Sequence, residues 1–254
     1  MDKAIVFTHN LLAENFAKTC HGLLRGTERF EIISVIDAAH EGKDAGTVLN
    51  GSPLGIPVHS SIAQFFKHSN ESPEFCIVGV AFPGGVLPED CRKELLAAMD
   101  HGLSIICGLH HYLSEDPEFQ ISAKNNGVKL IDIRKPRPVS ELHFWTGKIL
   151  EVTTPVIAIL GSDCAVGKRT TARFIMEVCR SRGIKTEMIY TGQTGWMQGY
   201  SHGFIFDATP NDFVSGEIER VILECVDVSK PDLILLEGQS SLRNPSGPCG
   251  SEFL

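Results

Sequence analysis

The sequence predicts an α/β protein of two consecutive domains, each built on a parallel sheet. Short apolar runs of strand length alternate along the 254-residue chain with segments of helical periodicity, which is typical of parallel sheets covered by helices. One such run, 155–160, leads into a glycine-bounded loop ending in Gly-Lys, and a helix-forming segment follows. Residues 134–148 contain prolines and lack clear periodicity, so we place the linker there and expect domains at 1–148 and 149–254.

The first half is predicted to form a Rossmann-like sheet. Its apolar runs have the length of buried strands, and the segments between them can form helices. We expect strands at 4–8, 30–36, 55–58, 75–81, 104–107 and 128–132. We expect helices at 10–24, 61–67 and 88–101.

Only part of a dinucleotide-binding pattern is present in this half. Asp37 ends the second predicted strand, where a Rossmann fold holds the acid that binds ribose. The turn after the first strand, 8–13, has no G-x-G-x-x-G, so the sequence does not predict NAD binding. Residues 82–85 after the strand ending at Ala81 suit either a ligand loop or a plain turn.

The second half is predicted to form a P-loop sheet of the nucleotide-binding type. After the strand at 155–160 we expect a helix at 172–179, a strand at 185–190, a helix at 212–228 with Asp212 as its N-cap, and a strand at 232–236. Sheets of this kind usually have about five or six strands. We therefore expect that the chain is truncated at its C-terminus, which leaves a sheet edge uncovered.

Composition excludes several classes of protein. A hydrophobic content of 43% with 21% charged residues is that of a globular protein with a sizeable core. The net charge of −8 and the lack of Lys/Arg clusters argue against nucleic acid or an anionic membrane as partner. The eight cysteines form no C-x-x-C pair, and the N-terminus lacks a signal-peptide pattern. We expect a cytoplasmic homo-oligomer that acts on a small molecule.

The candidate phosphate-binding loop follows the strand at 155–160. Its glycines let the backbone curl so that N–H groups point at an anion, and the following helix adds the positive end of its dipole. Lys168 supplies a cation that can reach a terminal phosphate. The residues that we expect to contact the phosphorylated cofactor are Gly161, Ser162, Asp163, Cys164, Ala165, Val166, Gly167, Lys168, Arg169, Thr170 and Thr171.

This loop departs from the common P-loop pattern in two ways. Five residues separate Gly161 from Gly167, whereas the common form has four. Arg169 stands where a Ser or Thr hydroxyl normally meets magnesium. Thr170 or Thr171 can take that place only if the helix begins in a different register. The pattern therefore predicts phosphate binding and leaves open whether the ligand is ATP with magnesium.

Three titratable side chains are candidates for catalysis. Glu237 follows an apolar strand, at the edge of a parallel sheet that faces ligands, and can bind magnesium or act as a base; the alternative is a solvated turn. Asp207 can contact a metal or a substrate ammonium group. His110, after the strand ending at Cys107, can bind substrate or transfer protons, or serve a structural role.

Taken together, the motifs resemble a known family along essentially the whole chain. Gly161–Thr171, Thr191–Gly195 and Glu237–Arg243 are similar to segments of the D-glutamate N-acetyltransferases, once described only as a domain of unknown function. Gly108-Leu-His110 and Asp132-Ile-Arg134 match the same family. Members of this family are longer at the C-terminus. The second domain is also similar to dethiobiotin synthetase and related P-loop ligases, which lack the inserted arginine.

The resemblance implies transfer of an acetyl group from acetyl-CoA to the amine of D-glutamate or a close relative. The loop then holds the phosphates of coenzyme A, with Glu237, Asp207 or His110 as the base. The residues expected at the substrate are Gln193, Thr194, Gln239 and Arg243. One alternative is an ATP-dependent ligase or kinase in which Thr170 and Glu237 hold magnesium. Another is a non-catalytic nucleotide-binding protein.

Overall fold

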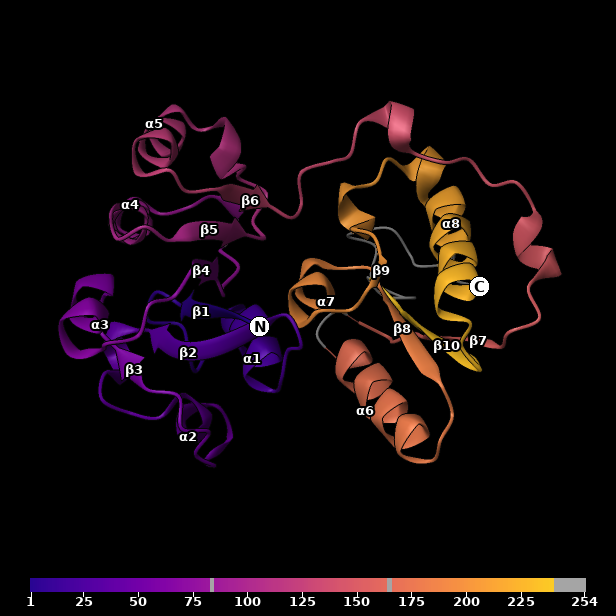
Figure 1. The fold of residues 1–254 in the computed structure, drawn as a ribbon, viewed down its shortest axis with the longest axis horizontal. Coiled ribbons are helices and arrows are strands. Elements are labelled where there is room, and N and C mark those ends of the chain that lie inside the picture. The colour runs from indigo at the N-terminus through magenta and orange to yellow at the C-terminus, as the bar shows by residue number, and fades with distance from the viewer. Residues whose placement is uncertain (83–84, 164–165, 240–254) are drawn as a thin grey trace. The chain divides into compact units, whose positions relative to one another are not determined.

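The structure is a computed structural model that describes residues 1–82, 85–163 and 166–239 (Figure 1). The chain divides into two compact units, and the predicted two-domain α/β architecture is confirmed. Met1–Lys135 and Met197–Gly199 form the first unit, and the remainder from Pro136 onward forms the second. The predicted linker, 134–148, therefore belongs almost entirely to the second unit.

The first unit is a six-stranded parallel sheet with the strand order β3-β2-β1-β4-β5-β6. This is the doubly wound Rossmann order. β1 lies inside the sheet, and Ala4, Ile5 and Val6 on it are completely buried. The strands are β1 (Asp2–Phe7), β2 (Phe30–Ile36), β3 (Val58–His59), β4 (Phe75–Val78), β5 (Ser104–Cys107) and β6 (Leu130–Asp132).

Five α-helices connect these strands within the described part of the first unit. They are α1 (Lys18–Leu24), α2 (Ala45–Asn50), α3 (Ile62–His68), α4 (Glu89–Asp100) and α5 (Pro117–Asn126). α5 was not predicted from the sequence, although its local signals are clear. Asp116 caps it by accepting from the N–H groups of Glu118 and Phe119, Pro117 occupies its first turn, and Gly127 ends it with a φ of 66°.

The helix predicted at 10–24 is wrong in its first half. α1 begins only at Lys18, after a 3₁₀ turn at Asn15–Ala17. The backbone at Asn10 is left-handed, with a φ of 63°, which breaks a helix. The N–H of Leu12 donates to the Asp37 carboxylate, 2.9 Å away, so a long-range contact replaces the helical hydrogen bond. The strand predicted at 55–58 is likewise shorter, because Gly55 is left-handed with a φ of 76°.

The second unit contains a four-stranded parallel sheet with the order β7-β10-β8-β9. The strands are β7 (Val156–Ile159), β8 (Thr186–Tyr190), β9 (His202–Gly203) and β10 (Leu233–Glu237). β9 is too short to show in the sequence pattern. Among the described strands β7 pairs only with β10, and Val156 and Ile157 are exposed.

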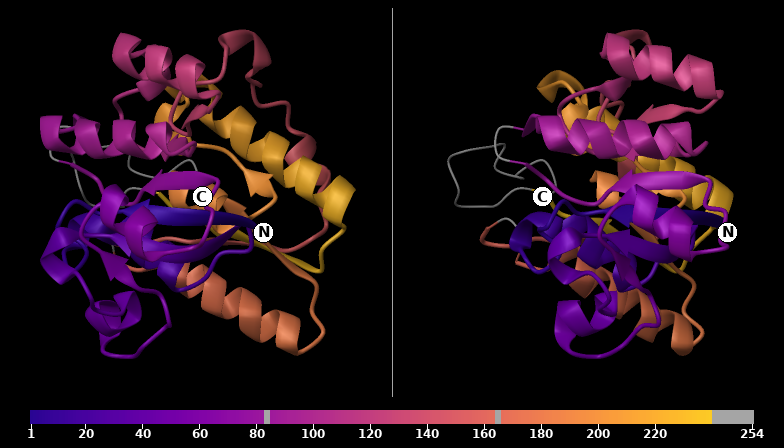
Figure 2. Two further views of the ribbon diagram at one scale, coloured as in Figure 1. Left: turned by 60° about the vertical axis from the view of Figure 1, so that its left-hand side comes forward. Right: turned by 90° about the vertical axis from the view of Figure 1, so that its left-hand side faces the viewer.

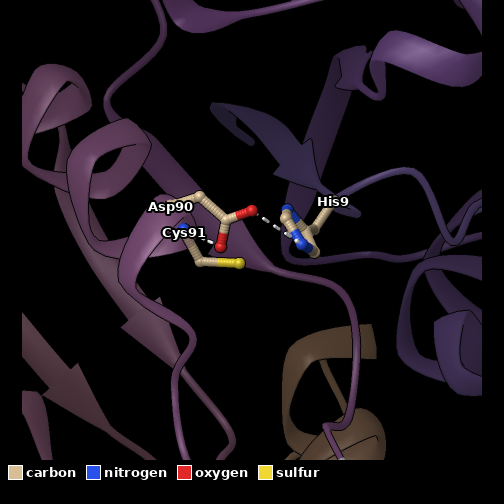
Figure 3. Close-up of side chains that lie close together, drawn as sticks. All are labelled: His9, Asp90 and Cys91. Carbon is tan, nitrogen blue, oxygen red and sulfur yellow. Dashed lines mark hydrogen bonds and ion pairs between the residues drawn. The ribbon is translucent and has the colours of Figure 1, made fainter.

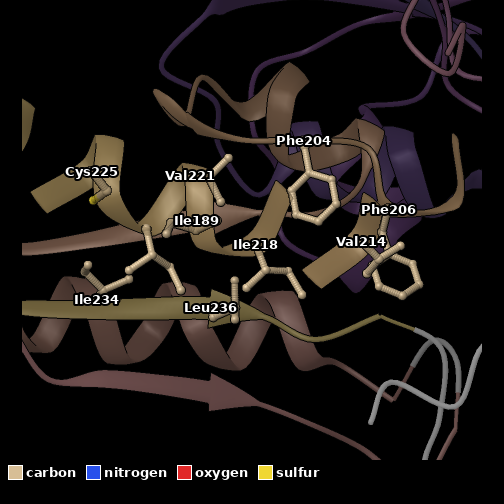
Figure 4. Packing of buried hydrophobic residues seen from close by; sticks show 10 residues of the cluster. Ile189, Phe204, Phe206, Val214, Ile218, Val221, Cys225, Ile234 and Leu236 are labelled. Atoms are coloured by element: carbon tan, nitrogen blue, oxygen red, sulfur yellow. The ribbon is translucent and has the colours of Figure 1, made fainter. Parts of the chain in front are cut away.

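Helices cover both faces of this sheet. Within the unit, α6 (Lys168–Ser181) and α8 (Asn211–Ser229) lie on opposite faces (Figures 1 and 2). Alternating side chains of β10 face the two helices: Leu235 packs with Ala172 and Met176 of α6, whereas Ile234 and Leu236 pack against α8 (Figure 4). The α8 core also contains Ile189, Phe204, Phe206, Val214, Ile218, Val221, Ile222 and Cys225.

Two predictions for the second unit need correction. Asp212 is not the N-cap of α8, because the helix begins at Asn211 after Pro210 and Asp212 lies inside the first turn. The segment after β8, for which no helix was predicted, forms the short helix α7 (Gln193–Gln198). Across the described ranges, every helix is too short or too polar to cross a lipid bilayer.

Candidate functional site

The predicted phosphate loop joins β7 to α6 in the second unit. Gly167 precedes the helix with a left-handed φ of 93°, which glycine adopts without strain. Gly161 is required for a different reason: a Cβ there would lie 2.7 Å from Val166 Cγ2. Both glycines that bound the motif are thus explained by the local fold. Cys164 and Ala165, also predicted to contact phosphate, lie outside the described residues.

The loop and the first turn of α6 are electropositive. Lys168 is the first residue of the helix, and its Nζ donates to the backbone carbonyl of Asp163 at 2.8 Å. The lysine side chain therefore folds back over the loop it follows. The first turn contains no acidic residue, so the positive end of the helix dipole is not neutralised there by the helix itself. This arrangement is suited to a phosphate or pyrophosphate.

Glu237 is the last residue of β10, beside the strand that leads into the loop. It pairs in register with Ile159 of β7, and its side chain is buried. Its Oε2 accepts from the Thr191 N–H at 3.1 Å, and the Thr191 hydroxyl donates to the Glu237 carbonyl at 2.7 Å. The structure therefore confirms that Glu237 lies at the carboxyl end of a central strand, and it excludes a solvated turn.

Arg169 pairs with this carboxylate. Arg169 Nη1 lies 3.6 Å from Glu237 Oε1. Burial raises the pKa of Glu237, and the opposing effects of Arg169, the Thr191 N–H and Lys168 do not cancel that rise. Thr170 is half-buried and Thr171 is exposed. In a magnesium-dependent P-loop enzyme, a carboxylate in this position binds the metal ion. Here the Glu237 carboxylate pairs with the Arg169 guanidinium instead.

Gly195 packs tightly beside Glu237, and Gly192 lies next to the end of the Gln239 side chain. A Cβ on Gly192 would lie 2.8 Å from Gln239 Nε2, and a Cβ on Gly195 would lie 2.3 Å from Tyr190 Cβ and 3.3 Å from Glu237 Oε2. The Gln239 side chain therefore lies close to Gly192, the residue directly before α7.

The other predicted substrate residues are placed less directly. Gln193 and Thr194 belong to α7, and Thr194 is buried. Arg243 lies outside the described residues. Asp207 is exposed in a 3₁₀ turn at Phe206–Ala208 in the second unit. These roles stay predictions.

His110 belongs to the first unit, whereas the loop belongs to the second. Its Nε2 lies 3.5 Å from Arg134 Nη1, and burial together with the charge of Arg134 lowers the pKa of His110. The neighbouring His111 lies 3.4 Å from Asp116 instead. The two histidines therefore have different partners.

Asp37 does not have the environment of a ribose-binding acid. It is buried, and its Oδ2 accepts from the Thr8 hydroxyl at 2.8 Å and from the Leu12 N–H at 2.9 Å. Its Oδ1 lies 2.8 Å from Nδ1 of His40. Both carboxylate oxygens are therefore used to hold the turn after β1. The structure offers no support for a dinucleotide at Asp37.

Sequence reasoning missed two partners of the site. Arg169 was expected only to contact phosphate, and Thr191 was named only within a segment similar to the related family. No signal in the sequence shows that both lie against Glu237, because that contact depends on the register of three strands and on where α6 begins.

Comparisons with known proteins agree with this architecture. Residues 38–136 match the family model described as DUF1611_N, a Rossmann-like domain of unknown function. Residues 143–254 match DUF1611_C, a P-loop domain of unknown function. The crystal structure of a DUF1611 family protein from Anabaena variabilis superposes with a TM-score of 0.88 at 26% identity, covering 98% of this chain and 69% of that one.

Two curated relatives have an assigned activity. A D-glutamate N-acetyltransferase of Tritonibacter scottomollicae is 33% identical over 169 residues, which is 65% of this chain and 47% of the relative. A second D-glutamate N-acetyltransferase, from a Pseudoalteromonas species, is 29% identical over 170 residues, 67% of this chain and 49% of the relative. The matched region spans about half the length of each of these relatives.

Proposed function

The chain belongs to the DUF1611 family, and from this premise we propose that it is a P-loop enzyme that acetylates the amine of D-glutamate or a close relative, with acetyl-CoA as donor. The names of the two curated relatives support the reaction. The electropositive turn around Lys168 supports the cofactor, because coenzyme A carries a pyrophosphate and a 3′-phosphate.

The choice of acetyl-CoA over ATP with magnesium rests on the Arg169–Glu237 pair. A magnesium-dependent P-loop enzyme holds its ion with the hydroxyl after the lysine and a nearby carboxylate. In this chain an arginine replaces the hydroxyl and lies 3.6 Å from the carboxylate. The positive charge that a metal ion would bring is thus supplied by the protein. This favours a phosphorylated ligand bound without magnesium, as acetyl-CoA can be.

Acetyl transfer requires a base, and Glu237 is the residue that we propose for it. The substrate ammonium group must lose a proton before its nitrogen attacks the thioester carbonyl. A C–N bond then forms, the C–S bond breaks, the nitrogen gives up a second proton to leave the neutral amide, and the thiolate of coenzyme A takes up a proton. Burial raises the pKa of Glu237, which brings its basicity closer to the working pH. Asp207 is the alternative base in the same unit.

An ATP-dependent ligase or kinase is the second candidate, and one observation favours it. Glu237 ends the strand next to the one that enters the loop, in register with Ile159. A carboxylate in this position is what a magnesium–nucleotide site needs. Under this alternative, Arg169 must move away from Glu237 when the metal ion binds.

Isothermal titration with acetyl-CoA and with ATP, each with and without magnesium, tests the proposal. We expect acetyl-CoA to bind without magnesium. Lys168→Ala should weaken that binding about 10- to 100-fold, since hydrogen bonds to charged groups contribute roughly 1.5–3 kcal/mol. Lys185→Ala is the matched control, because Lys185 is an exposed lysine of the same unit. Glu237→Gln should preserve binding and lower the rate of acetylation about 10²- to 10⁴-fold.

Arg169→Thr separates the two candidates, since it restores the hydroxyl of the common motif. The transferase proposal expects weaker acetyl-CoA binding in this variant. The ligase alternative expects unchanged or tighter binding of ATP with magnesium. Tight magnesium-dependent ATP binding by the wild-type chain, with none of acetyl-CoA, would overturn the proposal. Binding of ATP without turnover of any amino acid would instead favour a nucleotide-sensing protein.

A further inference from the structure

The first unit has a topological switch point between β1 and β4. From β1 the chain proceeds outward through β2 and β3, and it then returns to the other side of β1 to form β4, β5 and β6. In open parallel sheets of this kind, ligands bind at the carboxyl ends of the strands where the order reverses. Nothing in the proposed function uses this position, which lies in the other unit from the phosphate loop.

Three side chains with metal-binding chemistry meet at this point. His9 follows β1, and Asp90 and Cys91 lie in the first turn of α4, the helix that follows β4 (Figure 3). Their ligand atoms, a ring nitrogen, a carboxylate oxygen and the cysteine sulfur, all lie within 4.8 Å of one another. His9 Nε2 and Asp90 Oδ2 are 3.4 Å apart. The sequence does not show this cluster, because some eighty positions separate His9 from the other two residues.

The surroundings hold these side chains in place. His9 and Asn10 both have left-handed backbones, with φ of 47° and 63°, in the turn that Asp37 fixes. The His9 ring packs near Phe7 and Phe82, with centroids 6.0 and 5.8 Å away. Cys91 is completely buried, whereas Asp90 is largely exposed. The cluster therefore has an ordered inner side and an open outer side.

We propose that His9, Asp90 and Cys91 bind a divalent transition-metal ion of the zinc class. Imidazole nitrogen, carboxylate oxygen and thiolate sulfur are the three donors that zinc takes from proteins. Donor atoms about 2.0–2.3 Å from a tetrahedral centre lie roughly 3.3–3.8 Å apart, so the His9–Asp90 distance of 3.4 Å already fits, and the Cys91 sulfur lies within 4.8 Å of both partner atoms. Three protein ligands leave the fourth position for water or an anionic ligand, as in catalytic zinc sites.

The free thiol is protonated before the ion binds. Burial, together with the negative charges of Asp90 and Glu94, raises the pKa of Cys91 to about 12. A bound cation reverses this effect, because a coordinating thiol loses its proton to the solvent when the metal–sulfur bond forms.

Titration of the metal-free chain with Co²⁺ tests the site without any assay of activity. We expect one ion per chain and a sulfur-to-cobalt charge-transfer band, together with visible d–d bands of tetrahedral intensity. Zinc should displace the cobalt and abolish both. His9→Gln should weaken cobalt binding by more than the roughly 10- to 100-fold cost of losing an outer-shell partner. Cys91→Ser should remove the charge-transfer band.

Cys76→Ser is the matched control, since Cys76 is an equally buried cysteine in the same unit. It should keep the cobalt spectrum, and circular dichroism establishes that each variant is folded. Failure of the wild-type chain to take up cobalt or zinc stoichiometrically overturns the proposal. A charge-transfer band that persists in folded Cys91→Ser overturns it as well. The phosphate-loop proposal is unaffected by either result, because its titrations use Lys168 and Arg169.

Discussion

Folding disfavours the ionised form of Glu237, because its carboxylate is buried in the folded protein and hydrated in the unfolded chain. Burial raises its pKa above the ordinary value of 4.5. Between the unfolded and folded pKa values, the unfolded chain has lost the proton and the folded protein still holds it. The free energy of unfolding therefore falls as the pH rises through this window, and the loss persists at higher pH.

Glu237→Gln should remove this penalty. We expect a larger free energy of unfolding near pH 7, by about 1.4 kcal/mol for each unit by which the folded pKa exceeds the unfolded one, a net shift that already includes the attraction of Arg169. Urea unfolding at several pH values measures it. Glu177→Gln is the control, since its half-exposed carboxylate pairs with Arg173 on the surface of α6. A variant less stable than the wild type at neutral pH contradicts the expectation.

At the scale of elements, two buried glutamates of α8 hold the segment 137–151, called here the α8-bound segment. Glu217 accepts hydrogen bonds from Arg137 at 2.8 Å and from the His143 N–H at 3.0 Å. Glu219 accepts from the Thr146 N–H at 2.6 Å and from the Ile149 N–H at 3.1 Å. A Cβ on Gly216 would lie 1.9 Å from the His143 carbonyl oxygen, so the two backbones touch.

These glutamates respond to pH in the opposite sense to Glu237. Burial by itself raises the pKa of Glu219, but the hydrogen bonds from Thr146 and Ile149 outweigh it and leave the pKa lowered. Burial also raises the pKa of Glu217, but the hydrogen bonds from Arg220 and His143, together with the charges of Arg220 and Arg137, outweigh it and leave the pKa lowered. Their stabilisation is present above the ordinary value of 4.5 and is lost as the pH falls through the folded values.

Glu219→Ala should loosen the α8-bound segment. The N–H groups of Thr146 and Ile149 lose their acceptor, so we expect the free energy of unfolding to fall by about 1–3 kcal/mol. Limited proteolysis at neutral pH should show faster cleavage within 137–151, and the wild type should approach that rate in acid. Asp227→Ala is the control, because Asp227 is an exposed acid of the same helix. Equal cleavage rates in the two variants speak against this role of Glu219.

At the scale of the whole molecule, the first unit uses residues from two separate parts of the sequence. Met197–Gly199 belong to it, although they follow β8 of the second unit. The side-chain amide of Gln198 donates to the Gly22 carbonyl at 2.9 Å and to the Gly26 carbonyl at 3.1 Å, at the end of α1. These contacts span up to 176 positions in the sequence.

Gln198→Ala should destabilise the first unit. It leaves two backbone carbonyls without their donor, so we expect a loss of about 1–3 kcal/mol in the free energy of unfolding. Hydrogen exchange should locate the loss by faster exchange in α1 and β1. Gln64→Ala on α3, a half-buried glutamine of the same unit, serves as the control. Unchanged exchange in α1 counts against the prediction.

Most elements were predictable because their signals are local. The strands at 30–36 and 104–107 match β2 and β5 in full, and the glycine-bounded loop lies between β7 and α6 as expected. The errors occur where a distant contact decides the backbone. The carboxylate of Asp37 stops the helix predicted from Asn10, and packing of Gly195 against Tyr190 accompanies a helix that was not predicted.

The sequence by itself determined the two α/β sheets, the position of the phosphate loop and the carboxylate at the end of β10, since periodicity, glycine placement and helix signals act over a few neighbouring residues. Only the tertiary structure decided that Arg169 pairs with Glu237, that α8 buries two glutamates, and that His9 meets Asp90 and Cys91. Each of these contacts joins residues that are distant in the chain. Strand order and register bring them together, and neither is encoded in a local pattern.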